Sequence, residues 1–231
     1  MILRDWEDLP DSMKTEAVRP YYDALGKKRV ALAFKRVFDI VVAVLMLIVL
    51  SPLFLVISAV IKLDSKGPVF YRQTRITSYG KEFKIHKFRT MVTGADKMGT
   101  QVTVGEDARI TKAGKILRGC RLDEIPQLID VIEGNMSFVG TRPEVPQYVD
   151  AYSDEMMATL LVPAGITSEA SIRYKDEAEL LDAADDVDRV YIERVLPDKM
   201  KYNLESVMNF SFFGEIATMF RTVLAVLGKD Y

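Results

Sequence analysis

The run from Ile40 to Ile61 restricts the fold most, because only Ser51, Pro52 and Ser58 within it are not apolar. A straight helix over this run is about 33 Å long, enough to cross a hydrocarbon core of roughly 30 Å. Apolarity on all faces over such a length disfavours a buried helix of a soluble protein. The acidic, proline-containing residues before the run disfavour a cleaved signal peptide. The run therefore predicts a segment that lies in a membrane.

The centre of this run carries Ser51-Pro52. Proline removes a backbone donor, clashes with the carbonyl of Ile48 and pushes the residue before it out of helical geometry. In a spanning helix the pair would produce only a mild kink. In a re-entrant segment it would form the turn, and the Ser51 hydroxyl would donate a hydrogen bond back to an exposed carbonyl.

Both flanks of the run are basic. Lys27, Lys28, Arg29, Lys35 and Arg36 precede it, and Lys62, Lys66, Arg72 and Arg75 follow it. Because basic flanks prefer the cytoplasmic side of a membrane, a spanning helix should have one basic-rich flank and one basic-poor flank. The pattern therefore favours a re-entrant helix, broken at Ser51-Pro52, that enters and leaves through the same face. Asp39, at the mouth of the run, is expected to pair with Arg36 at the headgroup level.

The composition limits the chemistry of the other parts of the chain. Its 231 residues include 31 basic and 33 acidic ones, and the net charge of −2 argues against a nucleic-acid-binding protein. Cys120 is the only cysteine and His86 the only histidine, so a disulfide framework and a cysteine-based zinc cluster are excluded. A hard cation held by carboxylates remains compatible with the composition. His86 is interpreted as a structural residue.

The chain divides into three predicted parts: an amphipathic leader over 1–34, the membrane segment over 35–63 and a domain over 64–231. The apolar anchors of the leader, which are expected to pack on the domain or on the membrane surface, are Trp6, Leu9, Tyr21, Tyr22 and Leu25. In the domain, β-rich stretches beside turn signals predict two hairpin-like strands, Val69–Arg72 and Glu82–His86. The predicted fold class is α+β: a broken re-entrant helix, and a small, mainly helical domain with a short β unit and an amphipathic interfacial helix.

Glycine, proline and apolar spacing predict further elements. Residues 94–114 predict a loop, Pro163–Gly165 a turn, and Asp176–Arg194 a solvated helix. A stripe of Leu122, Ile125, Leu128, Ile129 and Ile132 predicts one helix that ends at Gly134-Asn135. Phe210–Gly228 has an amphipathic helical pattern, which fits either a core helix or an interfacial helix beside the membrane.

The strongest chemical signal is the adjacent pair Asp123-Glu124. It precedes Pro126 near the start of the helix predicted from the stripe that begins at Leu122. One explanation is structural, because aspartate is a good N-cap and glutamate favours a first helical turn. The other is that Arg118 and Arg121 hold Asp123 ionised beside a phosphate. One carboxylate would then act as a nucleophile and the other would bind a hard divalent cation.

Basic residues recur near glycine and proline elsewhere. Lys84, Lys87 and Arg89 lie in the segment KIHKFRTM, and Arg142 lies in SFVGTRPE. Arginines in rigid turns suit bidentate binding of phosphate oxygens, although exposed lysines and arginines are common. The glycine-loop motifs of common NTPases and dinucleotide enzymes do not occur, and neither do HExxH and GxSxG.

Four segments, in this order, resemble the bacterial sugar transferase family, the monotopic polyprenyl-phosphate phosphoglycosyl transferases. They are KRVFDIVVAVLMLIVLSPLFLVISAVIKLDSKGPVFYRQTRI, KFRTM, LRGCRLDEIPQLIDVIEGNMSFVGTRPE and VPAGIT, and they run from about Lys35 to Gly165. Several motifs in one order are far more specific than any of them alone. The resemblance implies transfer of a sugar-1-phosphate from a UDP-sugar to undecaprenyl phosphate, with release of UMP. It also implies a role in exopolysaccharide or glycoconjugate assembly at the cytoplasmic face of the bacterial inner membrane.

The same resemblance implies roles for individual residues. Asp123 matches the nucleophile that forms a covalent phosphosugar intermediate, and Glu124 matches the partner that holds Mg²⁺ on the diphosphate. The residues implied to lie around the phosphates are Lys87, Arg89, Arg118 and Arg142. Lys35 and Arg36 match a basic membrane-entry pair, and Ser51-Pro52 match the break in the re-entrant helix.

The chain departs from the family after VPAGIT, where many members carry a stretch that ends in Gly-Arg and this chain reads SEASIRYKDE. That stretch lies near the expected nucleotide-sugar site, so the sugar and the polymer are not implied, and homo-oligomerisation stays open. The alternative is a non-catalytic, membrane-tethered protein that binds nucleotide sugars or partner transferases. It would show no turnover and would tolerate changes at Asp123 and Glu124.

Overall fold

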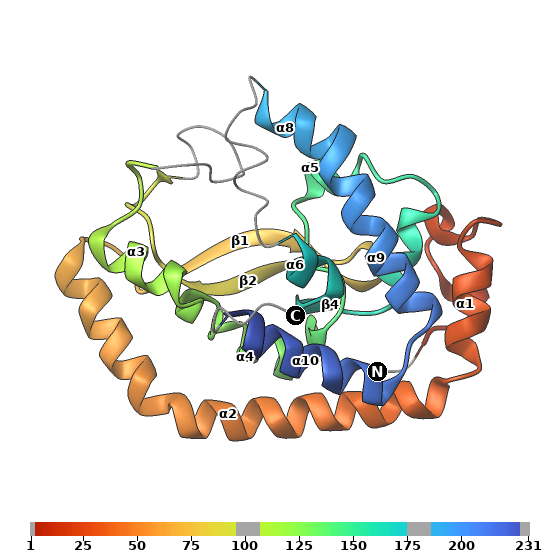
Figure 1. Cartoon of the computed structure of the whole chain (residues 1–231), viewed down its shortest axis with the longest axis horizontal. Helices are drawn as coiled ribbons and strands as arrows, with labels where there is room; N and C mark the ends of the chain where they lie inside the picture. Colours follow the sequence, from red (N-terminus) through yellow and green to blue (C-terminus); the bar gives the residue numbers. More distant parts are fainter. Residues whose placement is uncertain (1–2, 96–106, 175–185, 227–231) are drawn as a thin grey trace.

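The computed structural model describes residues 3–95, 107–174 and 186–226 of the chain. In these residues, helices and two small sheets form a mixed α+β fold, as predicted. Strands β1 (Phe70–Ile76) and β2 (Glu82–Phe88) pair antiparallel, so the predicted hairpin exists and is longer than expected. Strands β3 (Met136–Val139) and β4 (Ala164–Thr167) pair in parallel. Figure 1 shows these strands on one side of the long helix α2 (Arg29–Asp64).

Further helices and helical turns make up the rest of the described fold. In chain order they are η1 (Trp6–Asp8), η2 (Asp11–Met13), α1 (Arg19–Gly26), η3 (Ser78–Gly80), α3 (Lys112–Gly119), η5 (Leu122–Glu124), α4 (Gln127–Glu133), α5 (Pro146–Val149), η6 (Met156–Leu161), α6 (Glu169–Arg173), α8 (Val187–Val190), the π-helical turn η7 (Tyr191–Val195), α9 (Leu196–Met208) and α10 (Phe212–Val226). Leu9, Tyr21, Tyr22 and Leu25 of the predicted leader are buried in one core with residues of η6 and α9. The leader therefore packs on the domain.

Helix α2 contains the whole apolar run and is one continuous helix with Pro52 inside it. Figure 1 shows that it bends near its middle. The predicted break is therefore a bend within a helix. The Ser51 hydroxyl donates to the carbonyl of Ile48 at 2.8 Å. This is the carbonyl that the missing N–H of Pro52 leaves without its helical donor, so the hydroxyl replaces the lost hydrogen bond.

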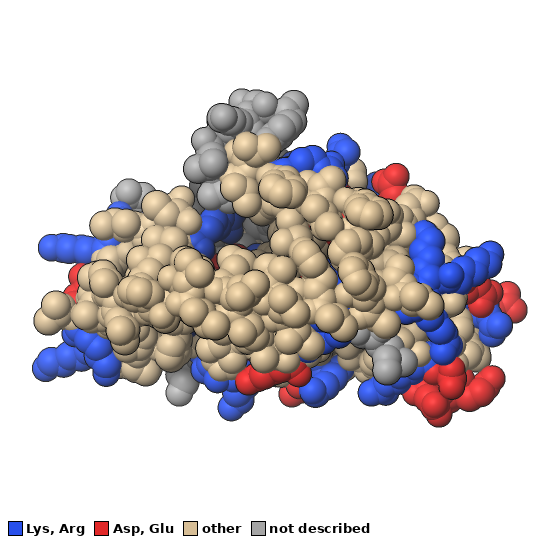
Figure 2. All heavy atoms as spheres, turned by 90° about the horizontal axis from the view of Figure 1, so that it is seen from below, with Lys and Arg blue, Asp and Glu red and all other residues tan. Residues whose placement is uncertain are grey.

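Most of the surface of α2 faces away from the rest of the chain. In its most apolar stretch only 11% of the residues are buried, and α2 is the one helix among the described residues that is long and apolar enough to cross a membrane. The large apolar side chains exposed on it are Val30, Phe34, Val37, Val41, Val44, Leu45, Met46, Ile48, Val49, Leu55, Val56, Val60 and Leu63. Figure 2, which views this side of the molecule, shows a broad belt without charged residues and charged side chains around it. Such an extensive apolar surface indicates association with a membrane.

Both arms of α2 pack against the same domain. In the first arm, Leu32 joins the core that contains α1, and Ala43 joins the core that contains α4. In the second arm, Ile57 and Ile61 pack against Leu117 of α3 and against the end of β2. The domain therefore bridges the two arms on the concave side of the bend.

Two charged residues just before the apolar run, Lys35 and Asp39, are buried. Lys35 lies 3.4 Å from Asp39 and 2.5 Å from Glu215 of α10. Asp39 is 1% exposed and accepts a hydrogen bond from Ser137 at 2.7 Å. Arg36 donates instead to two carbonyls at the C-terminal end of α4. The expected pair of Arg36 and Asp39 at the headgroup level is therefore wrong, because α2 presents both side chains to the domain, where each finds a different partner.

Three other predicted segments differ from the structure. Pro163–Gly165 is not a turn, because Ala164 and Gly165 begin strand β4. A Cβ on Gly165 would lie 2.2 Å from the amide nitrogen of Gly140, so this glycine permits close strand packing rather than a turn. Part of the loop predicted over 94–114 lies outside the described residues, and α3 already begins at Lys112. Part of the helix predicted over 176–194 also lies outside them, and its described part has a buried face rather than a fully solvated one.

Helix α10 has features of both a core helix and an interfacial helix, the two interpretations of its amphipathic pattern. Thr218 is buried against the domain, and its hydroxyl donates to Glu169 at 2.6 Å. Phe213, Phe220 and Val223 are exposed. The helix thus covers the core with one face and presents apolar side chains with the other.

Candidate active site

Asp123 and Glu124 line a cleft of about 960 Å³, close to the upper end of the roughly 300–1,000 Å³ range of small-molecule sites. The basic residues that line it are Arg72, Arg75, Lys87, Arg89, Arg109, Arg118, Arg121 and Arg142. Among the described residues, Asp123 and Glu124 are its acidic lining residues. Such a concentration of cations in a chain whose net charge is −2 favours an anionic ligand. The cleft brings together all the residues that the sequence singled out around the phosphates.

Asp123 lies in the short turn η5 rather than in one long helix that starts at Leu122. Helix α4 begins only at Gln127, after Pro126. Arg121, just before the turn, has a left-handed backbone with φ 55°. A left-handed residue other than glycine is strained, and such residues cluster at functional sites. Neither η5 nor α4 has a side-chain hydrogen bond at its N-cap. Asp123 therefore does not act as the N-cap that the structural explanation required.

The side chain of Asp123 lies in a largely buried position, because the residue is only 8% exposed. Burial raises the pKa of its carboxyl group, and the charge of Glu124 adds to this rise. Lys87 and Arg118 oppose the rise. Asp123 is therefore a more basic carboxylate than an exposed one, and its ionisation depends on the surrounding cations.

Glu124 has a different environment. Lys87 Nζ lies 2.9 Å from its Oε1, and Arg142 donates to Oε1 at 2.5 Å and to Oε2 at 3.4 Å. Burial alone would raise the pKa of Glu124, but Arg142 and Lys87 outweigh burial and hold it well below its ordinary value. Adjacent carboxylates with pKa values pushed apart are typical of sites where each has its own role.

The other predicted basic residues differ in what they contact. Arg118, at the end of α3, donates from Nε to the Thr90 hydroxyl at 3.0 Å. Arg89 is buried and donates to the carbonyls of Ser65 and Lys66 at 2.8 and 2.6 Å, so it ties the end of α2 to the end of β2. Both line the cleft.

Sequence reasoning did not assign Arg72, Arg75 and Arg109 to the site. Arg72 and Arg75 were interpreted only as a basic flank of the membrane segment. Lys84 was grouped with the basic cluster, but its side chain is not part of the cleft lining. The pairing of β1 with β2 places Arg72 opposite His86, and motif spacing does not encode which of these residues line the cleft.

The two carboxylates fit a Mg²⁺ ion that is shared with a ligand. Mg²⁺ is usually bound through one or two carboxylates, substrate phosphates and water. Oε2 of Glu124 has the longer of the two contacts with Arg142, and Asp123 is adjacent in the turn. These residues would supply the protein oxygens, and a diphosphate would supply others.

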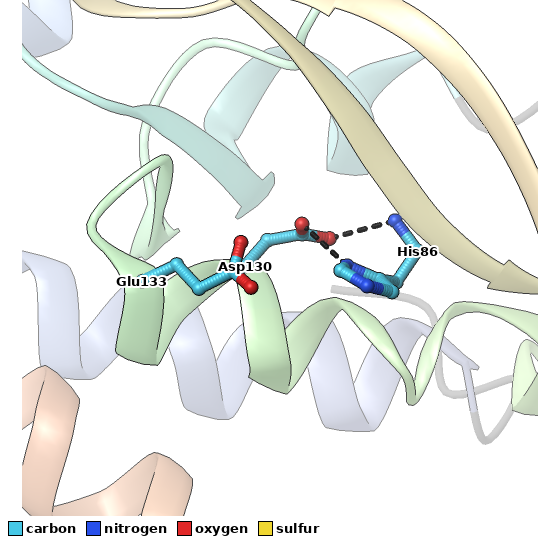
Figure 3. Close-up of side chains that lie close together, drawn as sticks. All are labelled: His86, Asp130 and Glu133. Carbon is cyan, nitrogen blue, oxygen red and sulfur yellow. Dashed lines mark hydrogen bonds and ion pairs between the residues drawn. The ribbon is translucent and has the colours of Figure 1, made fainter.

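A second group of possible metal ligands is already engaged internally. Ligand atoms of His86, Asp130 and Glu133 lie within 4.8 Å of one another. Figure 3 shows the Asp130 carboxylate turned toward His86, whose backbone N–H and Nδ1 each lie 2.8 Å from it. The other ring nitrogen of His86 lies 2.5 Å from Nη1 of Arg72. These contacts connect β1, β2 and α4, and they support a structural role for His86.

Comparison with known proteins decides the family. Residues 30–229 match the sequence profile of the bacterial sugar transferase family. The chain belongs to this family. The match extends beyond the stretch of about Lys35 to Gly165 in which the resemblance is visible, so it includes the C-terminal helices of the domain.

Relatives in this family carry names that describe sugar-phosphate transfer. The chain is 34% identical over 196 residues to the UDP-N-acetylgalactosamine-undecaprenyl-phosphate N-acetylgalactosaminephosphotransferase of Aeromonas hydrophila, a match that covers 84% of the chain and 43% of that relative. It is 36% identical over 220 residues to the UDP-glucose:undecaprenyl-phosphate glucose-1-phosphate transferase of Escherichia coli K12, with 92% and 44% coverage. It is 32% identical over 207 residues to the exopolysaccharide production protein ExoY of Sinorhizobium fredii, with 83% and 84% coverage. The chain thus spans less than half the length of the first two relatives.

Proposed function

We propose that this chain transfers a sugar-1-phosphate from a UDP-sugar to undecaprenyl phosphate and releases UMP, as a step of exopolysaccharide or glycoconjugate assembly. The observation that carries the proposal is the pair Asp123-Glu124 in a cation-lined cleft, on a domain attached to an exposed apolar helix. Two relatives are named as transferases from UDP-sugars to undecaprenyl phosphate, and a third is named for exopolysaccharide production. These names support the same reaction here.

Asp123 is the proposed nucleophile. One of its carboxylate oxygens attacks the phosphorus that carries the sugar, the bond from this phosphorus to the oxygen of UMP breaks, and UMP leaves with the bonding electron pair. An acyl phosphate that links the Asp123 carboxylate to the phosphosugar remains. In the second step an oxygen of the polyprenyl phosphate attacks the same phosphorus, and the Asp123 carboxylate leaves. The product carries the sugar on a lipid-linked diphosphate.

The basic residues of the cleft lower the barrier by balancing the negative charge at the reacting phosphate. Glu124 holds Lys87 and Arg142 in place before a ligand arrives, so little reorganisation is needed. Arg118 and Lys87 favour the ionised form of Asp123. A Mg²⁺ ion bound with the diphosphate would add charge neutralisation.

The proposal includes a re-entrant anchor on the cytoplasmic face of the bacterial inner membrane. The packing of the domain against both arms of α2 supports an arrangement with both ends of the helix on the side of the bilayer that holds the domain. The basic flanks of the helix favour the cytoplasmic side. In this arrangement the bend enters the hydrocarbon, while the cleft remains within reach of the phosphate of a lipid acceptor.

Release of UMP tests the reaction. Purified protein in nanodiscs is mixed with undecaprenyl phosphate, MgCl₂ and each of a panel of UDP-sugars. We expect turnover with at least one donor, loss of turnover in Asp123→Asn, and an unchanged rate in Asp154→Asn, which alters an exposed aspartate. Full turnover by Asp123→Asn would remove Asp123 as nucleophile. Binding of a donor without turnover in the wild type would favour the non-catalytic alternative.

Labelling of the helix ends tests the anchor. Exposed Cys120 is first replaced by serine, and single cysteines are then introduced at Val30 or Leu63, which are 85% and 88% exposed. In sealed vesicles of one orientation, a membrane-impermeant maleimide should label both positions from the same side. Labelling from opposite sides would show a spanning helix.

A further inference from the structure

Arg142 reaches Glu124 from the segment 140–145, and the first half of this segment is attached to strand β4. The N–H of Gly140 donates to a carbonyl of β4 at 3.0 Å, and the carbonyl of Thr141 accepts from an N–H of β4 at 2.8 Å. These backbone bonds set where the segment starts. The direction of the Arg142 side chain also depends on how the second half is held.

The second half of the segment is held by β1 and by the C-terminal part of the domain. The N–H of Ile76 donates to the carbonyl of Glu144 at 2.9 Å, and Arg75 donates to the carbonyl of Pro143 at 3.1 Å. The carboxylate of Glu144 accepts a hydrogen bond from the hydroxyl of Tyr191 at 2.7 Å. Glu144 and Tyr191 are both buried, so this bond is protected from water.

Tyr191 is itself fixed by its surroundings. It begins the π-helical turn η7, and its ring packs against the ring of Tyr148 with centroids 4.7 Å apart. Lys199 of α9 donates to its hydroxyl at 3.3 Å. A π-helical turn changes the direction of the side chains that follow and is frequent at functional sites. The structure therefore holds the Tyr191 hydroxyl against Glu144.

Glu144 and Glu124 pair with different cations around the site. The carboxylate of Glu144 lies 4.0 Å from Arg75, while Glu124 binds Lys87 and Arg142. All three cations line the same cleft, where burial lowers the pKa of Lys87 and the charges of Arg142 and Arg75 lower it further against the opposing charge of Glu124. Because Arg75 lies beside Glu144, the carboxylate of Glu124 pairs with Lys87 and Arg142.

We propose that Glu144 and Tyr191 are positioning residues that hold Arg142 against Glu124 without touching the substrate. This inference rests on the proposed function and deepens it, because it gives the segment after residue 186 a part in the geometry of the phosphate site. Loss of the Tyr191 hydroxyl should leave the fold intact and should misplace Arg142. A misplaced charge-stabilising group affects the transition state more than substrate binding.

The test compares two tyrosines in the same cluster. Tyr191→Phe should lower kcat for UMP release by about tenfold to a hundredfold, by analogy with the loss when a partner that orients a metal ligand is removed, with a smaller change in KM for the donor. Glu144→Gln should do the same, and the double variant should lose no more than the stronger single variant. Tyr148→Phe is the matched control, because it removes a buried hydroxyl that donates to Asp188 at 2.6 Å. It should keep the wild-type kcat.

Wild-type kcat in folded Tyr191→Phe and Glu144→Gln, or an equal loss in Tyr148→Phe, would overturn the inference. If the wild type releases no UMP with any donor, the proposed function fails, and thermal unfolding then decides the inference. Tyr191→Phe and Arg142→Lys are combined, and each single variant and the pair are measured. The two losses in Tm should fail to add, because Arg142 depends on Tyr191, whereas Tyr148→Phe and Arg142→Lys should add. Additive losses for the first pair would overturn the inference.

Discussion

Docking of α10 on α2 should depend on pH through one carboxyl group. Glu215 of α10 faces Lys35 and Asp39 of α2. Burial raises the pKa of Glu215 from 4.5 to about 7, and Asp39 adds to the rise, although the contact with Lys35 opposes it. The folded protein therefore prefers the neutral carboxyl group, whereas the unfolded chain ionises it near 4.5.

The sign and size of the effect follow from these two pKa values. The contribution of Glu215 to stability is fully present below pH 4.5 and is lost as the pH rises through about 7. A rise of this size corresponds to about 3 kcal/mol of unfolding free energy, at about 1.4 kcal/mol per pH unit. For a domain of this length, about 3 kcal/mol corresponds to a shift of roughly 6–12 °C in Tm.

Thermal unfolding of the wild type and of Glu215→Gln between pH 5 and pH 8 measures this effect. The glutamine cannot ionise, so the Tm of the variant should rise relative to that of the wild type as the pH increases. Glu169→Gln is the control, because Glu169 also pairs with α10, through Arg221 at 2.5 Å, and this variant should follow the wild-type pH dependence. A difference in Tm between wild type and Glu215→Gln that stays constant with pH would refute the reasoning.

Three further substitutions have defined outcomes. Glu124→Gln should abolish turnover and lower the unfolding free energy by about 3 kcal/mol, because two cations lose a buried carboxylate; an unchanged Tm would contradict this. Gly165→Ala should lower the unfolding free energy measured with denaturant by about 1–3 kcal/mol, since the new Cβ would lie 2.2 Å from the nitrogen of Gly140. Ser51→Ala should cost about 1 kcal/mol in the same assay, because the carbonyl of Ile48 loses its donor, and wild-type stability would show that the hydroxyl is dispensable.

The elements that depend on local sequence were predicted well. The hairpin of β1 and β2, the end of α4 at Gly134 and the helical pattern of α10 are all present, because turn residues and apolar spacing act over a few neighbours. Gly134 has φ 90°, the left-handed conformation that favours glycine at the end of a helix. Strand β4 was missed because its residues pair in parallel with a distant strand, and small residues are also typical of turns.

The candidate site was predicted in part. Asp123, Glu124 and the basic residues of recognisable motifs do meet in one cleft. The contributions of Arg72 and Arg75 were not predicted, because they depend on where tertiary packing places β1 beside the cleft. The partner of Asp39 was predicted wrongly, because Arg36 donates to the end of α4, while Asp39 lies 3.4 Å from Lys35 on the same helix and accepts a hydrogen bond from Ser137 of β3.

The sequence by itself determined that the chain carries a long apolar helix suited to a membrane, and that an acidic pair occurs in a motif with nearby basic residues. Both properties are written in consecutive residues, where hydrophobicity and motif order need no knowledge of distant contacts. Only the tertiary structure decided that Pro52 bends α2 without interrupting it, that one domain packs against both arms, and that Tyr191 reaches the segment carrying Arg142. These features arise where segments far apart in the chain bury surface and pair charges together, and the free energy of such contacts depends on geometry that no local pattern specifies.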